Sequence, residues 1–145
     1  MTIKTMLNLN TLRDEVYENA KVHGFHEVKR TVGDGLMLIC TEASEAFEAY
    51  REGGKLAEMR YECKDPKGDC GEDRSPLCHL DDWDRATLGS DARLHKPVGV
   101  PSEIADIIIR CFDFAGEHGI DIERAVEEKM AYNKSRPFKH GGKVL

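Results

Sequence analysis

The chain has 145 residues, which is the size of one domain, and 40% of them are hydrophobic and 33% charged. Its 27 acidic residues outnumber 21 lysines and arginines, leaving a formal charge of −6. This balance argues against non-specific nucleic-acid binding, which needs a cationic surface. The apolar runs are too short to cross a membrane, and no signal peptide is visible at the N-terminus. We therefore expect a single cytoplasmic domain over 1–145 with reduced cysteines, binding neither nucleic acid nor membrane.

Four segments are predicted to be helical. They run from about Thr11 to His23, from about Asp34 to Glu52, from Pro101 to about His118, and from the N-cap Asp121 to near Ser135. For the first helix, Asn10 or Thr11 suits the N-cap and Gly24 suits the position after the C-terminus. No segment shows sustained β alternation, so we expect an all-α core in the form of a four-helix bundle.

Residues 54–100 differ from the rest, since they combine three cysteines, three prolines and many acids. We expect a long irregular insertion between the second and third helices, with short helical pieces at Lys55–Tyr61 and Asp81–Leu88. Loops of this length are uncommon and are usually functional.

Two pairs of acids carry the chemical interpretation. Glu42 and Glu45 lie three residues apart on the second helix, and Glu103 and Asp106 have the same spacing on the third. Residues at this spacing are neighbours on a helix surface, and like charges there repel unless a cation lies between them. If the two helices are adjacent, the four carboxylates can hold Mg²⁺, which prefers oxygen ligands. The alternative is that each pair is a solvated helix face.

The third helix is apolar around more than half of its circumference. Its polar residues form one narrow stripe, comprising Glu103, Asp106, Arg110, Asp113 and Glu117. A helix of this kind is typically central and packed on most sides. Because four helices of this size leave the central ones poorly covered, we expect a second subunit to complete the burial, in a homodimer or a dimer of dimers.

Together these residues resemble the MazG-like all-α nucleoside triphosphate pyrophosphohydrolases. The similarity begins with the spacing of the two acidic pairs. It extends over most of 10–53 and 100–145, in the blocks 12–21, 24–25, 38–51, 103–110, 119–122, 128–137 and 140–143. The insertion at 54–100 is longer than the corresponding gap in the family, and it could lie over the substrate pocket.

The resemblance implies an enzyme that cleaves a nucleoside triphosphate between its α- and β-phosphates, releasing a nucleoside monophosphate and pyrophosphate. Glu42, Glu45, Glu103 and Asp106 would hold Mg²⁺, with Mn²⁺ as a substitute. Glu42 or Glu45 would also act catalytically by orienting or deprotonating the attacking water.

Further residues are candidates for substrate binding. Lys129 and Asn133 lie one turn apart on the fourth helix, and Arg136 follows; together they could hold phosphates. The alternative for the basic residues is that they complement the negative end of the helix dipole. Phe25 and His26 follow the first helix, where members of the family contact the base, so Phe25 could stack on it. Equally, Phe25 could close the core behind Gly24.

Other interpretations stay open. Cys63, Cys70, Cys78 and His79 offer four ligands for a structural Zn²⁺, although their spacing lacks a Cys-x2-Cys pair and ordinary reduced thiols are the alternative. Within the same superfamily, a dUTPase- or dCTPase-type enzyme or a phosphoribosyl-ATP pyrophosphohydrolase is the alternative activity. A non-catalytic zinc-binding interaction module is the rival from another class.

Overall fold

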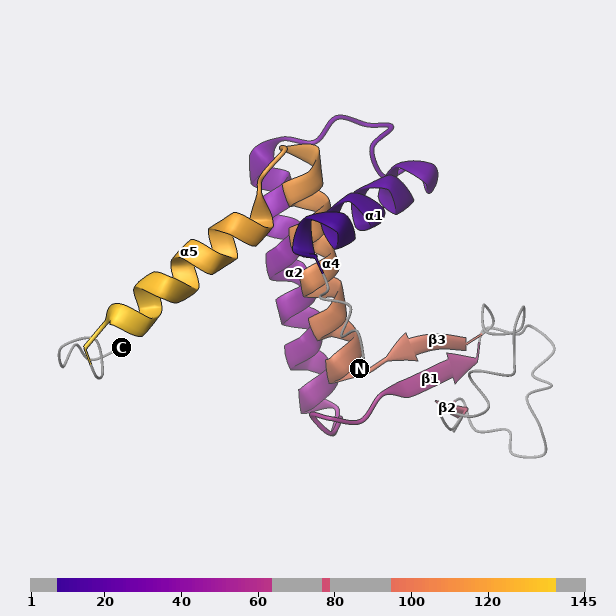
Figure 1. The fold of residues 1–145 in the computed structure, drawn as a ribbon. Helices are drawn as coiled ribbons and strands as arrows, with labels where there is room; N and C mark the ends of the chain where they lie inside the picture. The colour runs from indigo at the N-terminus through magenta and orange to yellow at the C-terminus, as the bar shows by residue number, and fades with distance from the viewer. Residues whose placement is uncertain (1–7, 64–76, 79–94, 138–145) are drawn as a thin grey trace, which may run out of the picture. The chain divides into compact units, whose positions relative to one another are not determined.

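The computed structural model describes residues 8–63, 77–78 and 95–137. These residues form the helices α1 (Leu9–Val22), α2 (Val32–Arg51), α4 (Val100–Glu117) and α5 (Ile122–Ser135), and the strands β1 (Arg60–Cys63), β2 (Leu77–Cys78) and β3 (His95–Val98) (Figure 1). The predicted all-α core is confirmed. In the described part of the chain, no helix combines the length and apolarity that a membrane span needs.

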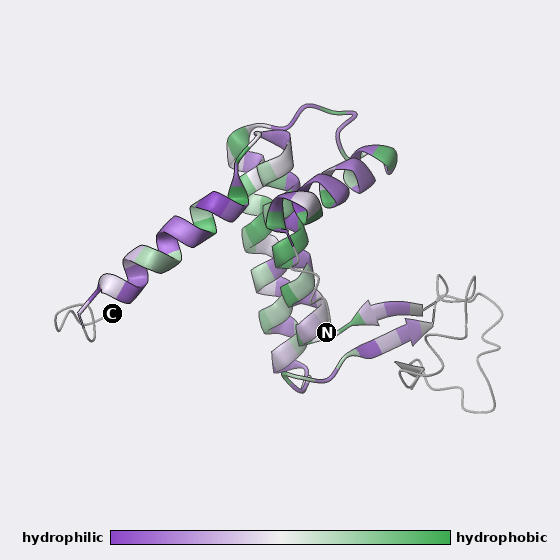
Figure 2. Cartoon of the chain, viewed as in Figure 1, coloured by the Kyte–Doolittle hydropathy of each residue, from purple (hydrophilic) through white to green (hydrophobic). Residues whose placement is uncertain are grey.

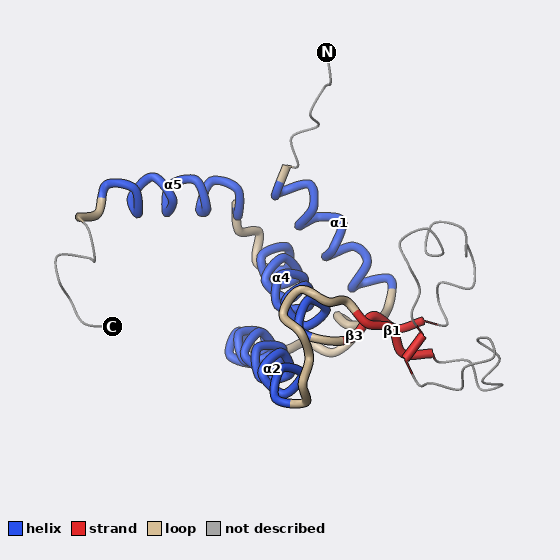
Figure 3. The backbone as a smooth tube through the Cα atoms, turned by 90° about the horizontal axis from the view of Figure 1, so that it is seen from below, coloured by secondary structure: helices blue, strands red, loops and turns tan. Residues whose placement is uncertain are grey.

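The chain divides into two compact units. The first comprises Met1–Gly35 and Ile109–Leu145, and the second comprises Leu36–Ile108. Helices α2 and α4 each contribute one part to each unit, and within each unit they lie side by side (Figures 1 and 3). Figure 2 shows hydrophobic residues concentrated on these two helices, whereas α5 is mainly hydrophilic.

In the first unit, α1 begins two residues earlier than predicted. The Asn8 side chain is the N-cap, and its Oδ1 accepts a hydrogen bond from the Thr11 backbone N–H at 2.9 Å. Asn10 and Thr11, the predicted caps, therefore lie inside the helix. Its end is as predicted, because Gly24 adopts a φ of +78° just after the C-cap His23, a conformation that favours glycine.

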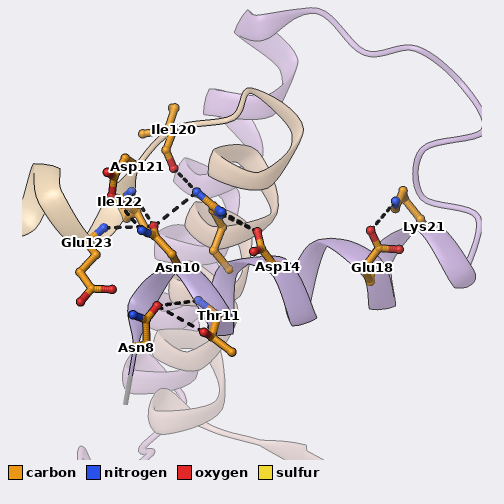
Figure 4. Close-up of polar contacts among 11 residues, drawn as sticks. Asn8, Asn10, Thr11, Asp14, Glu18, Lys21, Ile120, Asp121, Ile122 and Glu123 are labelled. Carbon is orange, nitrogen blue, oxygen red and sulfur yellow. Dashed lines mark hydrogen bonds and ion pairs between the residues drawn. The ribbon is translucent and has the colours of Figure 1, made fainter. Parts of the chain in front are cut away.

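Asn10 instead joins α1 to the start of α5 (Figure 4). Its Nδ2 donates to Asp121 Oδ1 at 2.8 Å, and its Oδ1 accepts from the Ile122 backbone N–H at 3.1 Å. Asp121 is the N-cap of α5, as predicted, and accepts from the Arg124 backbone N–H. The hydrogen bond from Asn10 is the main cause of a lowered pKa at Asp121. Arg13 completes the junction by donating to the Ile120 carbonyl at 2.7 Å.

Two glycines let helices approach closely in the first unit. A Cβ on Gly116 of α4 would lie 2.5 Å from the Tyr17 Cβ of α1, and one on Gly35 of α2 would lie 2.9 Å from the Phe114 ring of α4. Both separations are below ordinary van der Waals contact, so these positions need the absence of a side chain.

In the second unit, the insertion is not wholly irregular. Strand β1 pairs antiparallel with both β2 and β3, in the order β2-β1-β3. The helical piece expected at Lys55–Tyr61 is wrong, since a turn there leads into β1; the piece expected at Asp81–Leu88 lies outside the described residues. Strand β3 leads through Gly99 into α4, where the Ser102 hydroxyl donates to the Pro97 carbonyl at 3.1 Å. These connections anchor the sheet at the N-terminus of α4.

Candidate metal centre

Three of the four predicted carboxylates meet in the second unit. Glu42 of α2 and Glu103 and Asp106 of α4 each place a carboxylate oxygen within 4.8 Å of the other two. Glu42 is buried, and the two residues of α4 are half-buried. Oxygens bound to one Mg²⁺ at about 2.1 Å lie about 3 to 4.2 Å apart, so modest side-chain movement would bring all three into one coordination shell.

The electrostatics of this cluster oppose full ionisation in the absence of a cation. The pKa of Glu103 is raised, first by burial and then by the negative charges of Asp106, Glu45 and Glu42. Lys96 acts in the opposite direction and only partly offsets them. A divalent cation among these oxygens would relieve the repulsion.

Glu45, the fourth predicted ligand, lies beside the cluster rather than in it. It is exposed and does not belong to the three-oxygen group, but its charge reaches Glu103 and both residues line the same cavity. The structure thus brings three carboxylates together and places the fourth next to them.

The cavity has a volume of about 440 Å³ and extends from the cluster toward the sheet. Its lining comes from α2 and the residue after it, β1, the end of β3 and the start of α4 with the glycine between them. It comprises Glu45, Glu48, Ala49, Glu52, Arg60, Glu62, Val98, Gly99 and Glu103. Arg60 and Glu62 alternate along β1 with Tyr61, which is buried. Sequence reasoning missed these strand residues, because the period-two signal spans only four positions.

Phe25 and His26, the predicted base contacts, lie after α1 in the first unit. His26 is engaged within that unit: its Nε2 lies 2.7 Å from Asp113 Oδ1, and its ring meets the Tyr17 ring edge-on at 5.0 Å. Phe25 is exposed, and the Arg110 guanidinium lies 5.9 Å from its ring centroid. His26 therefore has a structural role there, and Phe25 keeps an accessible ring.

The predicted phosphate contacts Lys129, Asn133 and Arg136 are on or just after α5, also in the first unit, and all three are exposed. The charged ends of Lys129 and Arg136 lie 5.5 and 5.8 Å from the Tyr132 ring centroid. This arrangement groups two cations along one side of α5.

The proposed zinc ligands are only partly covered by the structure. Cys63 ends β1 and Cys78 ends β2, whereas Cys70 and His79 lie outside the described residues. Backbone pairing places Cys78 opposite Tyr61, two residues before Cys63. The zinc site stays a prediction.

No protein-family model, curated protein or solved structure matches the chain. The resemblance to MazG-like enzymes therefore stays a prediction based on the sequence motifs.

Proposed function

We propose that this chain hydrolyses nucleoside triphosphates between the α- and β-phosphates in a Mg²⁺-dependent reaction, giving a nucleoside monophosphate and pyrophosphate. The observation that carries the proposal is the grouping of Glu42, Glu103 and Asp106, whose oxygens lie within 4.8 Å of one another. The resemblance of the acidic pairs and their flanking residues to MazG-like enzymes supports the choice of reaction.

The chain's residues have distinct roles in this proposal. Glu42, Glu103 and Asp106 would hold Mg²⁺, or Mn²⁺ in its place, which when bound neutralises phosphate charge. Glu45 suits the role of general base better than Glu42, because it lies outside the three-oxygen group and is exposed. It would accept the proton of the water whose oxygen forms the new bond to phosphorus, while the bridging oxygen leaves with pyrophosphate.

The resemblance to MazG-like enzymes also gives residues of the first unit a role in substrate binding. Lys129, Asn133 and Arg136 are proposed to bind phosphates, and the exposed ring of Phe25 is proposed to stack on the base. His26 could contact substrate only by giving up its hydrogen bond to Asp113, so we assign it to positioning the segment that carries Phe25.

We also propose that the chain works in the cytoplasm as a homodimer or a dimer of dimers. On α4 the side chains of Ile104, Ile108 and Ile109 are 48%, 49% and 45% exposed, whereas Asp113 is only 7% exposed. Asp113 of the polar stripe is thus covered in the single chain, whereas these three isoleucines of the apolar arc are open. Burial of that arc by a second copy would remove apolar surface from water.

The direct test is a nucleotide screen with and without Mg²⁺ that measures monophosphate and pyrophosphate by ion-exchange chromatography. We expect pyrophosphate release that needs Mg²⁺ and falls about 100-fold or more in Glu45→Gln and in Asp106→Asn. Glu18→Gln, an exposed acid of α1 paired with Lys21, is the matched control and should retain full activity. Unchanged turnover in both site variants would contradict the proposal.

A further inference from the structure

Arg60 is the one basic residue among the nine described residues that line the cavity. It begins β1, where it pairs with Val98 of β3, which also lines the cavity. The other charged residues of the lining are Glu45, Glu48, Glu52, Glu62 and Glu103. Arg60 is therefore the one cation in a lining whose other described residues are acidic or apolar.

Two glycines lie against the Arg60 side chain. A Cβ on Gly99 would lie 3.5 Å from Arg60 Nε, and one on Gly54 would lie 3.5 Å from its Nη2. Gly54 follows α2 and donates its backbone N–H to the Ala49 carbonyl at 3.0 Å, while Gly99 precedes α4 with a φ of +99°. The guanidinium thus packs against the backbone at the ends of two helices, which restricts its orientation before any ligand binds.

The hydrogen-bonding state of Arg60 also indicates a role beyond packing. Its Nε is buried and has no hydrogen-bond partner among the described residues. A buried donor without a partner lowers stability, so its retention calls for an explanation. A small rotation of the guanidinium that brings Nε to a ligand acceptor in the cavity would supply a partner for this donor.

The charge of the lining decides which part of the substrate fits. The lining keeps an excess of negative charge even with Glu48 paired to Arg51 at 3.0 Å and Lys96 acting on Glu103, so it disfavours a further phosphate. A nucleobase is uncharged, and its edge offers acceptors to the arginine and N–H donors to the glutamates. The planar guanidinium can bind two acceptors on such an edge, and Ala49, Val98 and Gly99 supply an apolar wall for the ring.

We infer that Arg60 recognises the acceptor edge of the substrate's nucleobase and thereby sets base preference. The inference rests on the proposed function, because Glu103 belongs both to the carboxylate cluster and to the cavity. With the phosphates at the cluster, the cavity is left for the nucleoside. The two strands β1 and β3 belong to the insertion, which is the part of the chain that differs from the family it resembles. These strands would then determine which nucleobase the protein prefers.

The experiment compares R60Q and R60K with the matched control K55Q, which removes an exposed lysine paired with Glu58 on the turn before β1. The kcat/KM for each common nucleoside triphosphate is measured. For the preferred nucleotide we expect a fall of about 10- to 100-fold in both Arg60 variants, and a narrower spread among bases. R60K should behave like R60Q, because lysine keeps the charge but cannot bind two acceptors in one plane. K55Q should match the unmodified chain.

A second measurement separates the base from the phosphates. Inorganic tripolyphosphate, which has no base, should inhibit the unmodified chain and R60Q with the same inhibition constant. Far-UV circular dichroism checks the fold of each variant. If R60Q does not fold, the kcat/KM values and the tripolyphosphate inhibition of R60K decide the test.

Three results would overturn the assignment: R60Q as active and selective as K55Q, full activity in R60K, or tripolyphosphate inhibition weakened as much as nucleotide turnover. An unmodified chain that releases no pyrophosphate from any nucleotide contradicts the proposed function itself, and with it the premise of this inference.

Discussion

Replacing Glu103 with glutamine should stabilise the metal-free protein and abolish its stabilisation by Mg²⁺. Glu103 is partly buried and carries repulsion from Asp106, Glu45 and Glu42, which together raise its pKa. Glutamine keeps the shape and removes the charge. The substitution therefore removes an electrostatic repulsion that destabilises the folded chain only when no cation is bound.

The expected gain in the free energy of unfolding follows from the number of negatively charged neighbours of Glu103. A like-charge pair at such spacing costs about 0.2–0.5 kcal/mol, so three neighbours give roughly 1 kcal/mol. For a chain of 145 residues this raises Tm by about 4 °C in EDTA. In the unmodified chain, Mg²⁺ at about 100 times its dissociation constant adds about 2.7 kcal/mol, or about 10 °C.

The pH dependence has a definite sign. Because the pKa of Glu103 is raised, the folded chain binds this proton more tightly than the unfolded chain does. The contribution of Glu103 protonation to folding stability is fully present below the ordinary pKa of a glutamate. It is lost as pH rises through the raised pKa of the folded chain. The metal-free unmodified chain should therefore lose stability over that interval, and Glu103→Gln should not show this loss.

Thermal unfolding followed by circular dichroism, in EDTA at several pH values and in Mg²⁺, measures all three effects, with Glu18→Gln as the control for loss of an exposed acid. The reasoning is refuted if Glu103→Gln is no more stable than the unmodified chain in EDTA and still gains the full increment from Mg²⁺.

The remaining predictions concern packing and assembly. Gly116→Ala should destabilise the chain by about 1–2 kcal/mol in urea unfolding, because its Cβ would meet that of Tyr17; equal stability would show that the helices can separate freely. Asn10→Ala should cost about 1–2 kcal/mol by removing the hydrogen bonds to Asp121 and to the α5 backbone; a loss of only a few tenths would contradict the role of this junction. Ile108→Asp should lower the mass seen by light scattering to that of one chain or a smaller assembly, and an unchanged mass would exclude this face from the interface.

Helix boundaries could be predicted because glycine marks them locally. Gly24, Gly53 and Gly119 follow three of the helices and have φ values of +78°, +87° and +62°, which other residues rarely adopt. The N-cap of α1 was missed because Asn8, Asn10 and Thr11 are all suitable residues. Only the tertiary contacts of Asn10 with α5 distinguish them.

The sheet could not be predicted for a related reason. Strands β1 and β3 have four residues each, and their pairing joins Arg60 with Val98 across the whole insertion. Alternation over four residues is too short to indicate a strand, and pairing at that separation has no local signal. The acidic cluster was predictable because helical spacing alone groups Glu103 with Asp106, whereas Arg60 became visible only through strand pairing.

Titration with Mn²⁺, followed by electron paramagnetic resonance of the free ion, tests the central claim most directly. Unmodified protein should bind Mn²⁺, excess Mg²⁺ should displace it, and Glu42→Gln and Asp106→Asn should each weaken binding about tenfold or more while Glu18→Gln leaves it unchanged. Equal binding by the unmodified chain and both cluster variants would contradict the claim that these carboxylates form a cation site.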